Sequence, residues 1–200
     1  MSVTLDEMIQ YTARQTKRTE DVVKTGTVYM DDSLDIVNLY IDGFNYAKNK
    51  ICRERWKPRL TERFVVGQPM ALTKDLHKIK EIRVVDTDTL MEDWTVGPGL
   101  SINIPDMYLG MTVDIEYFYV IPDFPNNPTA TDLQINFPFP EGIVDYRILC
   151  FYACYEYLVV RGSDRDLDKS NFFLNKFNDG FYHIPKDLGA LKVVKDRARY

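Results

Sequence analysis

One long amphipathic segment, residues 32–56, constrains the fold of this chain more than any other stretch. Its apolar side chains recur at intervals of three and four residues, the pattern of a helix with one buried face. These side chains are Val37, Tyr40, Ile41, Phe44, Ala47 and Ile51. Ser33 and the two aspartates before it can cap the first amides, and Pro58 ends the helix. So wide an apolar face requires a partner elsewhere in the chain.

The partner predicted for this helix is residues 142–161, far downstream in the sequence. This segment, GIVDYRILCFYACYEYLVVR, is apolar on nearly all sides, so we expect a buried central helix. Gly162 is a suitable residue to follow its carboxyl end. Its most closely spaced apolar stripe consists of Val144, Ile148, Phe151, Tyr155 and Leu158.

Two further helices are predicted, at residues 4–16 and 164–181. In the first, Thr4 and Glu7 have the spacing of a capping box, in which each side chain accepts a bond from the other residue's backbone amide. Residues 17–29, which follow it, are expected to form a connection with a short extended piece. In the last helix, the predicted apolar face consists of Leu167, Leu174, Phe177 and Phe181.

The residues between the two long helices follow a different period. From Thr61 onward, apolar residues tend to alternate with polar ones, as they do in half-buried strands. Strands are predicted at residues 64–66, 78–85, 92–96, 100–104, 111–121 and 133–137. The strongest is 111–121, because Val113, Ile115, Tyr117 and Tyr119 share one face. Glycine and proline turns between short strands indicate an antiparallel sheet or a small sandwich.

These segments predict an α+β fold, in which a bundle of about three or four helices carries an inserted β-rich unit. The helical core is expected to comprise residues 1–60 and 138–183, and the insertion residues 61–137. Residues 184–200 combine Pro185 and Gly189 with several basic residues. They are too short and too mixed in character to pack as a domain, so we expect a carboxyl-terminal arm.

Charge and composition disfavour several classes of function. The net charge is −5 and the isoelectric point about 5.1, whereas nucleic-acid and membrane-surface binding rely on clustered lysine and arginine. No stretch is apolar enough to span a membrane, and the amino terminus lacks the apolar run of a signal peptide. Three cysteines, all in predicted helices, indicate reduced thiols. We therefore expect a soluble protein of the cytoplasm.

No arrangement of residues in the sequence predicts catalysis, a metal site or a cofactor. His77 and His183 each lack a partner residue at a catalytic spacing. Cys150 and Cys154 are four residues apart on one helix face, but burial in an apolar helix explains them better than metal binding. Glycine-rich phosphate loops and the common nucleophile and zinc motifs are absent from the sequence. We expect neither an enzyme nor a bound cofactor.

One cluster of basic residues lies at the end of the long helix and just after it: Arg53, Arg55, Lys57, Arg59 and Arg63. Contact with phosphate is one interpretation of this cluster. Ion pairs with acidic residues of a neighbouring subunit, or compensation of the helix dipole, are favoured over it. The cluster is therefore a candidate subunit interface.

Three stretches resemble the head–tail connector proteins of tailed bacteriophages, which are also called adaptor or head-completion proteins. IDGFNYAKNKICRERWKPRLTERFVV resembles the family's helix that ends in a basic run and enters a strand. MTVDIEYFYVIPDFP, followed by DLQINFPFPEGIVDYRILCFYACYEYLVVRGSD, resembles its strand, proline-rich loop and apolar helix. DKSNFFLNKFNDGF resembles its closing helix. The resemblance covers residues 33–182, and the first thirty residues match nothing in that pattern.

The resemblance implies a structural protein of the virion neck, assembled in the host cytoplasm. It implies a ring, usually of twelve copies, that binds under the portal protein, joins the capsid to tail or neck proteins, and passes DNA without sequence-specific contact. The carboxyl-terminal arm would then bind the portal. If this role is carried over, the apolar anchors are Ile184, Leu188, Leu191, Val193 and Val194, and the steering charges are Lys192, Lys195, Arg197 and Arg199.

Two alternatives stay open at this point. The arm can instead be a frayed terminus with no role. The β-rich insertion can instead be a module that binds a small molecule or a carbohydrate through its tyrosines, Tyr108, Tyr117 and Tyr119. Such a module would be a monomer with a defined aromatic pocket, whereas a connector assembles into a ring, so molecular mass distinguishes the two.

Overall fold

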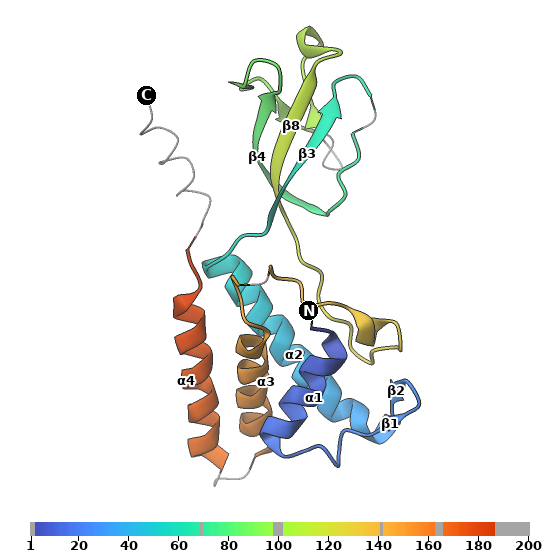
Figure 1. Cartoon of the computed structure of the whole chain (residues 1–200), viewed down its shortest axis with the longest axis vertical. Coiled ribbons are helices and arrows are strands. Elements are labelled where there is room, and N and C mark those ends of the chain that lie inside the picture. The colour runs from blue at the N-terminus through green and yellow to red at the C-terminus, as the bar shows by residue number, and fades with distance from the viewer. Residues whose placement is uncertain (1–2, 69, 98–101, 141, 163–165, 187–200) are drawn as a thin grey trace. The chain divides into compact units, whose positions relative to one another are not determined.

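The computed structural model describes residues 3–68, 70–97, 102–140, 142–162 and 166–186 (Figure 1). The chain divides into two compact units. The helical unit comprises Met1–Trp56 and Pro122–Tyr200, and the sheet unit comprises Lys57–Ile121. The described residues form four α-helices and antiparallel β-sheets, so the predicted α+β class is confirmed.

The helical unit is organised around its third helix. The helices are α1 (Leu5–Thr16), α2 (Asp31–Glu54), α3 (Tyr146–Arg161) and α4 (Leu167–His183). A short hairpin, β1 (Lys24–Thr25) with β2 (Val28–Tyr29), connects α1 to α2. Helix α3 contacts all three other helices, which confirms its predicted central position (Figure 1).

Two predictions about helix ends and faces hold in the structure. Thr4 and Glu7 form the capping box of α1, with the Thr4 amide 2.8 Å from Glu7 Oε2 and the Glu7 amide 3.3 Å from Thr4 Oγ1. The six apolar residues predicted for the buried face of α2 are each fully buried. They are Val37, Tyr40, Ile41, Phe44, Ala47 and Ile51.

Helices α2 and α3 approach closely at a glycine. A Cβ atom added to Gly43 would lie 2.6 Å from the Cα atom of Ala153, closer than two carbon atoms can pack. The absence of a side chain at Gly43 therefore lets the two backbones come together. Tyr46 of α2 and Tyr152 of α3 stack beside this contact, with ring centroids 4.6 Å apart.

Ser33 has a different role from the predicted one. Helix α2 begins at Asp31 after Met30, and no side chain caps its first amides. Ser33 instead accepts a hydrogen bond of 3.0 Å from the backbone amide of Val23. The serine is buried and ties the β1–β2 connection to the first turn of α2, while Asp31 and Asp32 supply negative charge near the positive end of the helix dipole.

The apolar faces of α3 and α4 were predicted only in part. Helix α3 begins at Tyr146 and buries Leu149, Cys150, Ala153 and Cys154, whereas Phe151 and Tyr155 of the predicted stripe are only half-buried. Helix α4 buries a row of phenylalanines, Phe173, Phe177 and Phe181, but leaves Leu167 exposed. A helix that is apolar nearly all round does not indicate which face is innermost, because each face satisfies the same pattern.

The sheet unit contains one antiparallel sheet of four strands in the order β3–β8–β4–β5. These strands are β3 (Arg59–Val65), β4 (Leu76–Val84), β5 (Thr89–Leu90) and β8 (Thr112–Tyr119). A separate two-stranded ribbon joins β6 (Thr95–Val96) to β7 (Ile102–Asn103). The structure thus has the predicted antiparallel sheet rather than a sandwich.

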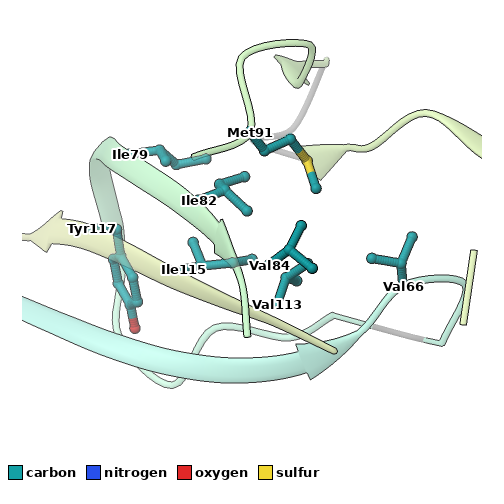
Figure 2. Close-up of a cluster of buried hydrophobic side chains, with 8 residues drawn as sticks. All are labelled: Val66, Ile79, Ile82, Val84, Met91, Val113, Ile115 and Tyr117. Atoms are coloured by element: carbon teal, nitrogen blue, oxygen red, sulfur yellow. The ribbon is translucent and has the colours of Figure 1, made fainter. Parts of the chain in front are cut away.

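One face of the sheet forms the apolar core of this unit (Figure 2). Val113, Ile115 and Tyr117 of β8 are fully buried, as the alternation predicted, and Tyr119 packs at the margin of the cluster. They meet Ile79, Ile82 and Val84 of β4, and Met91 and Val66 complete the cluster. Because β8 pairs with both β3 and β4, its alternation fixes the register of the sheet.

The boundaries of the insertion differ from the predicted ones. The sheet unit ends at Ile121, and residues 122–137 belong to the helical unit. The strand predicted at 133–137 is wrong, because Asp132–Gln134 form a turn of 3₁₀-helix, η3. The chain then pairs briefly with the amino terminus, through Leu5 N to Ile135 O at 2.8 Å and Phe137 N to Val3 O at 2.7 Å.

The contact at Gly43 yields a test of this arrangement. Gly43→Ala should lower the free energy of unfolding by about 1–3 kcal/mol, because the added methyl meets the backbone of α3. Alanine has a higher helix propensity than glycine, which alone would raise the free energy of unfolding by about 1 kcal/mol, so the steric cost must exceed this gain. Urea unfolding measures the difference. Glu54→Ala, at an exposed position of the same helix, should change stability by less than about 0.5 kcal/mol. Equal stability of Gly43→Ala and wild type would contradict the close approach.

Candidate functional site

The predicted portal-binding arm lies mostly outside the described residues. Of its nine residues named above, only Ile184 is described, and its side chain is 2% exposed. Leu188, Leu191, Lys192, Val193, Val194, Lys195, Arg197 and Arg199 lie beyond residue 186, where the description ends. Ile184 therefore belongs to the packed helical unit and not to a separate arm.

The predicted basic cluster is divided between the two units. Arg53 and Arg55 belong to the helical unit, where Arg53 is exposed. The guanidinium of Arg55 lies over the rings of Phe181 and Tyr182, with distances of 4.9 and 4.8 Å to the ring centroids. Cation–π contacts of this kind attract the end of α4 to the end of α2. Arg55 thus acts within its own chain.

The other cluster residues lie in the sheet unit and also meet partners there. Arg63 donates two hydrogen bonds to Asp114, of 2.8 and 2.9 Å, which hold the pKa of that carboxyl below its usual range. Arg59 pairs with Glu116 at 3.0 Å. Lys57 lies 6.0 Å from the ring centroid of Phe118. Acidic residues of the same chain therefore already pair with two of the arginines expected to bind a neighbouring subunit.

These pairs are part of a charged face on the sheet. The acidic residues of β8, Asp114 and Glu116, alternate with its buried residues and so point away from the apolar core. From β4, Lys80 reaches Glu116 at 2.9 Å and Arg83 reaches Glu81 at 2.9 Å. Asp114 and Glu116 of the central strand thus pair with basic residues of both neighbouring strands, and these cross-strand pairs stabilise the face.

The tyrosines of the alternative ligand-binding function are not equally accessible. Tyr117 is fully buried in the sheet core, and its hydroxyl donates a hydrogen bond of 3.1 Å to Glu62. Tyr108 and Tyr119 are half-buried and pack against the same cluster. A ligand cannot stack on the Tyr117 ring without opening the core, so the three tyrosines do not line one binding surface.

The histidines and cysteines take ordinary positions. His77 and His183 are both exposed. The thiols of Cys150 and Cys154 point to backbone carbonyl oxygens of α1, at 3.8 Å from Met8 O and 4.0 Å from Thr12 O. Burial raises the pKa of the Cys150 thiol to about 12, so the thiol stays protonated and unreactive at neutral pH. Among the residues that the structure describes, no group of acidic, histidine or cysteine side chains could hold a metal ion.

A polar contact that the sequence did not predict joins α2 to the loop that follows the sheet unit. Asn45 exchanges two hydrogen bonds with the backbone of Phe124, of 2.9 and 2.8 Å. Asn38 likewise accepts from the Asn127 amide at 2.7 Å and donates to its side chain at 2.9 Å. Asp42 and Asn49 extend the row, and we call these four residues the amide row. Their positions recur at intervals of four, three and four residues, a helical stripe that the sequence does contain.

Lys48 is the buried charge of this contact. Its side chain is fully buried, and its ammonium donates to Pro122 O at 2.7 Å and to Asp123 Oδ1 at 2.5 Å. Partial burial acts to raise the pKa of Asp123, but the bonds from Lys48 and Asn49 outweigh it and lower the pKa. A buried ammonium requires such partners, so Lys48 fixes where the loop returns to α2.

The helical unit also has a large apolar groove. It is a cavity of about 790 Å³ between the start of α3, the end of α4 and the loop at residues 137–144. We call it the α3–α4 groove. Most of its wall is aromatic or aliphatic, and the residues used below are Phe137, Phe139, Ile143, Tyr146, Phe151 and Ile184. Lys176 and His183 also line it.

Helix α4 exposes further apolar side chains. Its inner face packs on α3, where Tyr152 and Phe177 rings are 5.0 Å apart. On the rest of its surface, Leu167 is 55% exposed, Phe172 53% and Tyr182 68%. Solvent-exposed aromatic residues on one helix are typical of surfaces that another protein covers.

Comparison with models of known protein families found no match, and no curated protein matched the sequence. Within the described part of the chain, no helix is long and apolar enough to cross a membrane.

The ion pair of Lys48 yields a prediction with a defined pH dependence. Asp123→Asn removes the carboxylate from a buried ammonium and should cost about 1–2 kcal/mol of unfolding free energy, since Asp123 itself is partly exposed. Because folding lowers the pKa of Asp123, the pair stabilises the fold above the unfolded pKa of about 3.9 and loses this effect as pH falls further. Urea unfolding of wild type and variant at pH 7 and at lower pH measures the difference.

Asp31→Asn provides the control, because Asp31 is exposed and lies in the first turn of the same helix. It should cost only a few tenths of a kcal/mol, roughly the value of one charge near a helix terminus. A difference between wild type and Asp123→Asn that is constant with pH would contradict the role of the ion pair.

Proposed function

We propose that this chain is a structural head-to-tail connector of a tailed bacteriophage. Copies of the chain form a ring under the portal protein, extend the DNA channel and join the capsid to the tail. The chain works by assembly, not by catalysis. Its partners are other copies of itself, the portal, and tail or neck proteins, and DNA passes without sequence-specific contact.

The observation that carries this proposal is the exposed apolar surface of α4. Phe172 and Tyr182 are more than half exposed, although the same helix buries Phe173, Phe177 and Phe181. A neighbouring copy that packs against α4 would cover these two rings and remove their apolar surface from water. In a closed ring, the α4 surface of each copy is covered by the next copy, so no copy leaves this apolar surface exposed to water.

The order of the elements supports the same function. Helix α2 leads into strand β3, and β8 leads through a proline-rich loop into α3, followed by the closing helix α4. This is the order that the resemblance to connector proteins implies. On the sheet unit, Met107 and Leu109 are 69% and 66% exposed. They would contact either the next subunit or the tail-side partner.

The mass of the protein tests the proposal directly. Light scattering after size-exclusion chromatography should give several times the 23.4 kDa of one chain, either for the protein alone or after mixing with candidate portal protein. Assembly only with portal would agree with a connector that stays unassembled until it docks. A monomer of unchanged mass in the presence of portal proteins would exclude the connector function.

The role of α4 has its own test. Phe172→Asp with Tyr182→Asp should abolish the assembled species, because it removes both rings from the contact and places two charged groups there. Asn175→Asp adds a carboxylate at an exposed position of the same helix and should leave assembly unchanged. Circular dichroism checks that each variant is folded. Assembly of the double variant at wild-type concentration would exclude α4 as the subunit contact.

Portal binding by the arm is tested by two truncations. Removal of residues 187–200 should leave a folded protein and abolish portal binding in a pull-down. Removal from Ile184 onward should in addition lower stability by about 2–3 kcal/mol, because Ile184 is buried in the helical unit. Full portal binding by the shorter truncation would exclude the arm as the binding segment.

A further inference from the structure

The α3–α4 groove has the features of a binding site. Its volume of about 790 Å³ lies within the range of ligand pockets, which is about 300–1,000 Å³. Phe137, Phe139, Tyr146 and Phe151 supply aromatic walls, and the rings of Phe137 and Phe139 are 5.3 Å apart. Apolar surface of this kind is costly to leave in contact with water. The groove therefore favours an apolar occupant.

The groove also has polar and charged groups beside its apolar wall. Lys176 and His183 line it from α4, and Arg147 lines it from α3. Arg147 is already paired with Asp145, which also lies in the wall. Lys176 lies near the exposed ring of Phe172, at 5.6 Å from its centroid, and contributes positive charge beside the apolar wall. The wall is nevertheless mainly apolar, so apolar side chains are what an occupant must supply.

One segment of the chain fits this description and is attached at the right place. Residues 187–200 follow directly from Lys186, two residues after Ile184, whose side chain is part of the groove wall. Leu188, Leu191 and Val194 recur every third residue, a spacing found in segments that bind apolar grooves. The segment also contains two acidic residues, Asp187 and Asp196, and four basic ones, so its apolar residues and not its net charge favour the groove.

The distance and the connection favour the segment of the same chain. At about 3.3 Å per extended residue, Leu188 and Leu191 lie within roughly 13 and 23 Å of Ile184 along the chain, so both can reach the groove. A tethered segment is present at an effective concentration in the millimolar range, which lets a weak contact form. A segment from a second copy lacks this advantage.

We propose that the α3–α4 groove binds residues 187–200 of the same chain, with Leu188 and Leu191 as the apolar anchors. The groove is thus a site for the chain's own carboxyl-terminal segment. This inference does not depend on the connector function. If the connector function also holds, a portal that binds the segment must first compete with the groove.

Native lysines permit a direct test. Lys176 lies in the groove, and Lys192 and Lys195 lie in the segment. The intact protein, as an equal mixture of ¹⁴N-labelled and ¹⁵N-labelled chains, is treated with a short amine-reactive cross-linker and analysed by mass spectrometry. We expect links from Lys176 to Lys192 or Lys195 within chains of one isotope only. Hydrogen exchange at residues 143–151 should be slower in wild type than in Leu188→Asp with Leu191→Asp, by about tenfold.

The matched control is Gly189→Asp with Ala190→Asp, which adds the same two carboxylates beside the anchors. It should keep both the cross-links and the slow exchange, whereas the leucine double variant should lose both. All four positions lie after residue 186, outside the described residues, and circular dichroism checks that each variant is folded. Equal cross-linking and exchange in wild type and the leucine variant would overturn the proposal. Links of mixed isotope would overturn it too, since they would place a second copy's segment in the groove.

Discussion

The close approach of α2 and α3 at Gly43 is the constraint on which the rest of the helical unit depends. With the backbones that near, the buried stripe of α2 meets α3 directly, and Tyr46 and Tyr152 stack beside the contact. The other sides of helix α3 contact α1 and α4. A larger residue at position 43 would separate α2 from the helix that holds the other two.

Several charged side chains in the described part of the chain pair with groups of the same chain. Lys48 is the clearest case, because a fully buried ammonium is tolerated only where oxygen atoms are fixed around it. The charged face of the sheet follows the same rule, with Asp114 and Glu116 between basic neighbours. The basic residues between Arg53 and Arg63 therefore do not form one free basic surface in the structure. Within the described residues, α4 and the α3–α4 groove offer apolar surface to partners.

The sequence predicted correctly those elements whose residue pattern is compatible with only one buried face or one cap. The stripe of α2, the capping box at Thr4 and the alternation of β8 each fit one arrangement, and each was correct. Helix α3 is apolar on nearly all sides, so its innermost face depends on tertiary contacts that no local pattern contains. The segment at 133–137 has the composition of a strand but lacks a neighbouring strand of the sheet. The amide row was visible as a stripe, yet polar residues on a helix usually face solvent, so its bonding to a distant loop could not be foreseen.

The amide row and Lys48 bind the loop at residues 122–127, and all of these residues belong to the helical unit. The bonds that hold the chain as it leaves the sheet unit are thus independent of the sheet's own sequence. A replacement of residues 57–121 would therefore leave all of the bonding groups in place. The point at which the chain re-enters the helical unit is set by the helical unit's own residues.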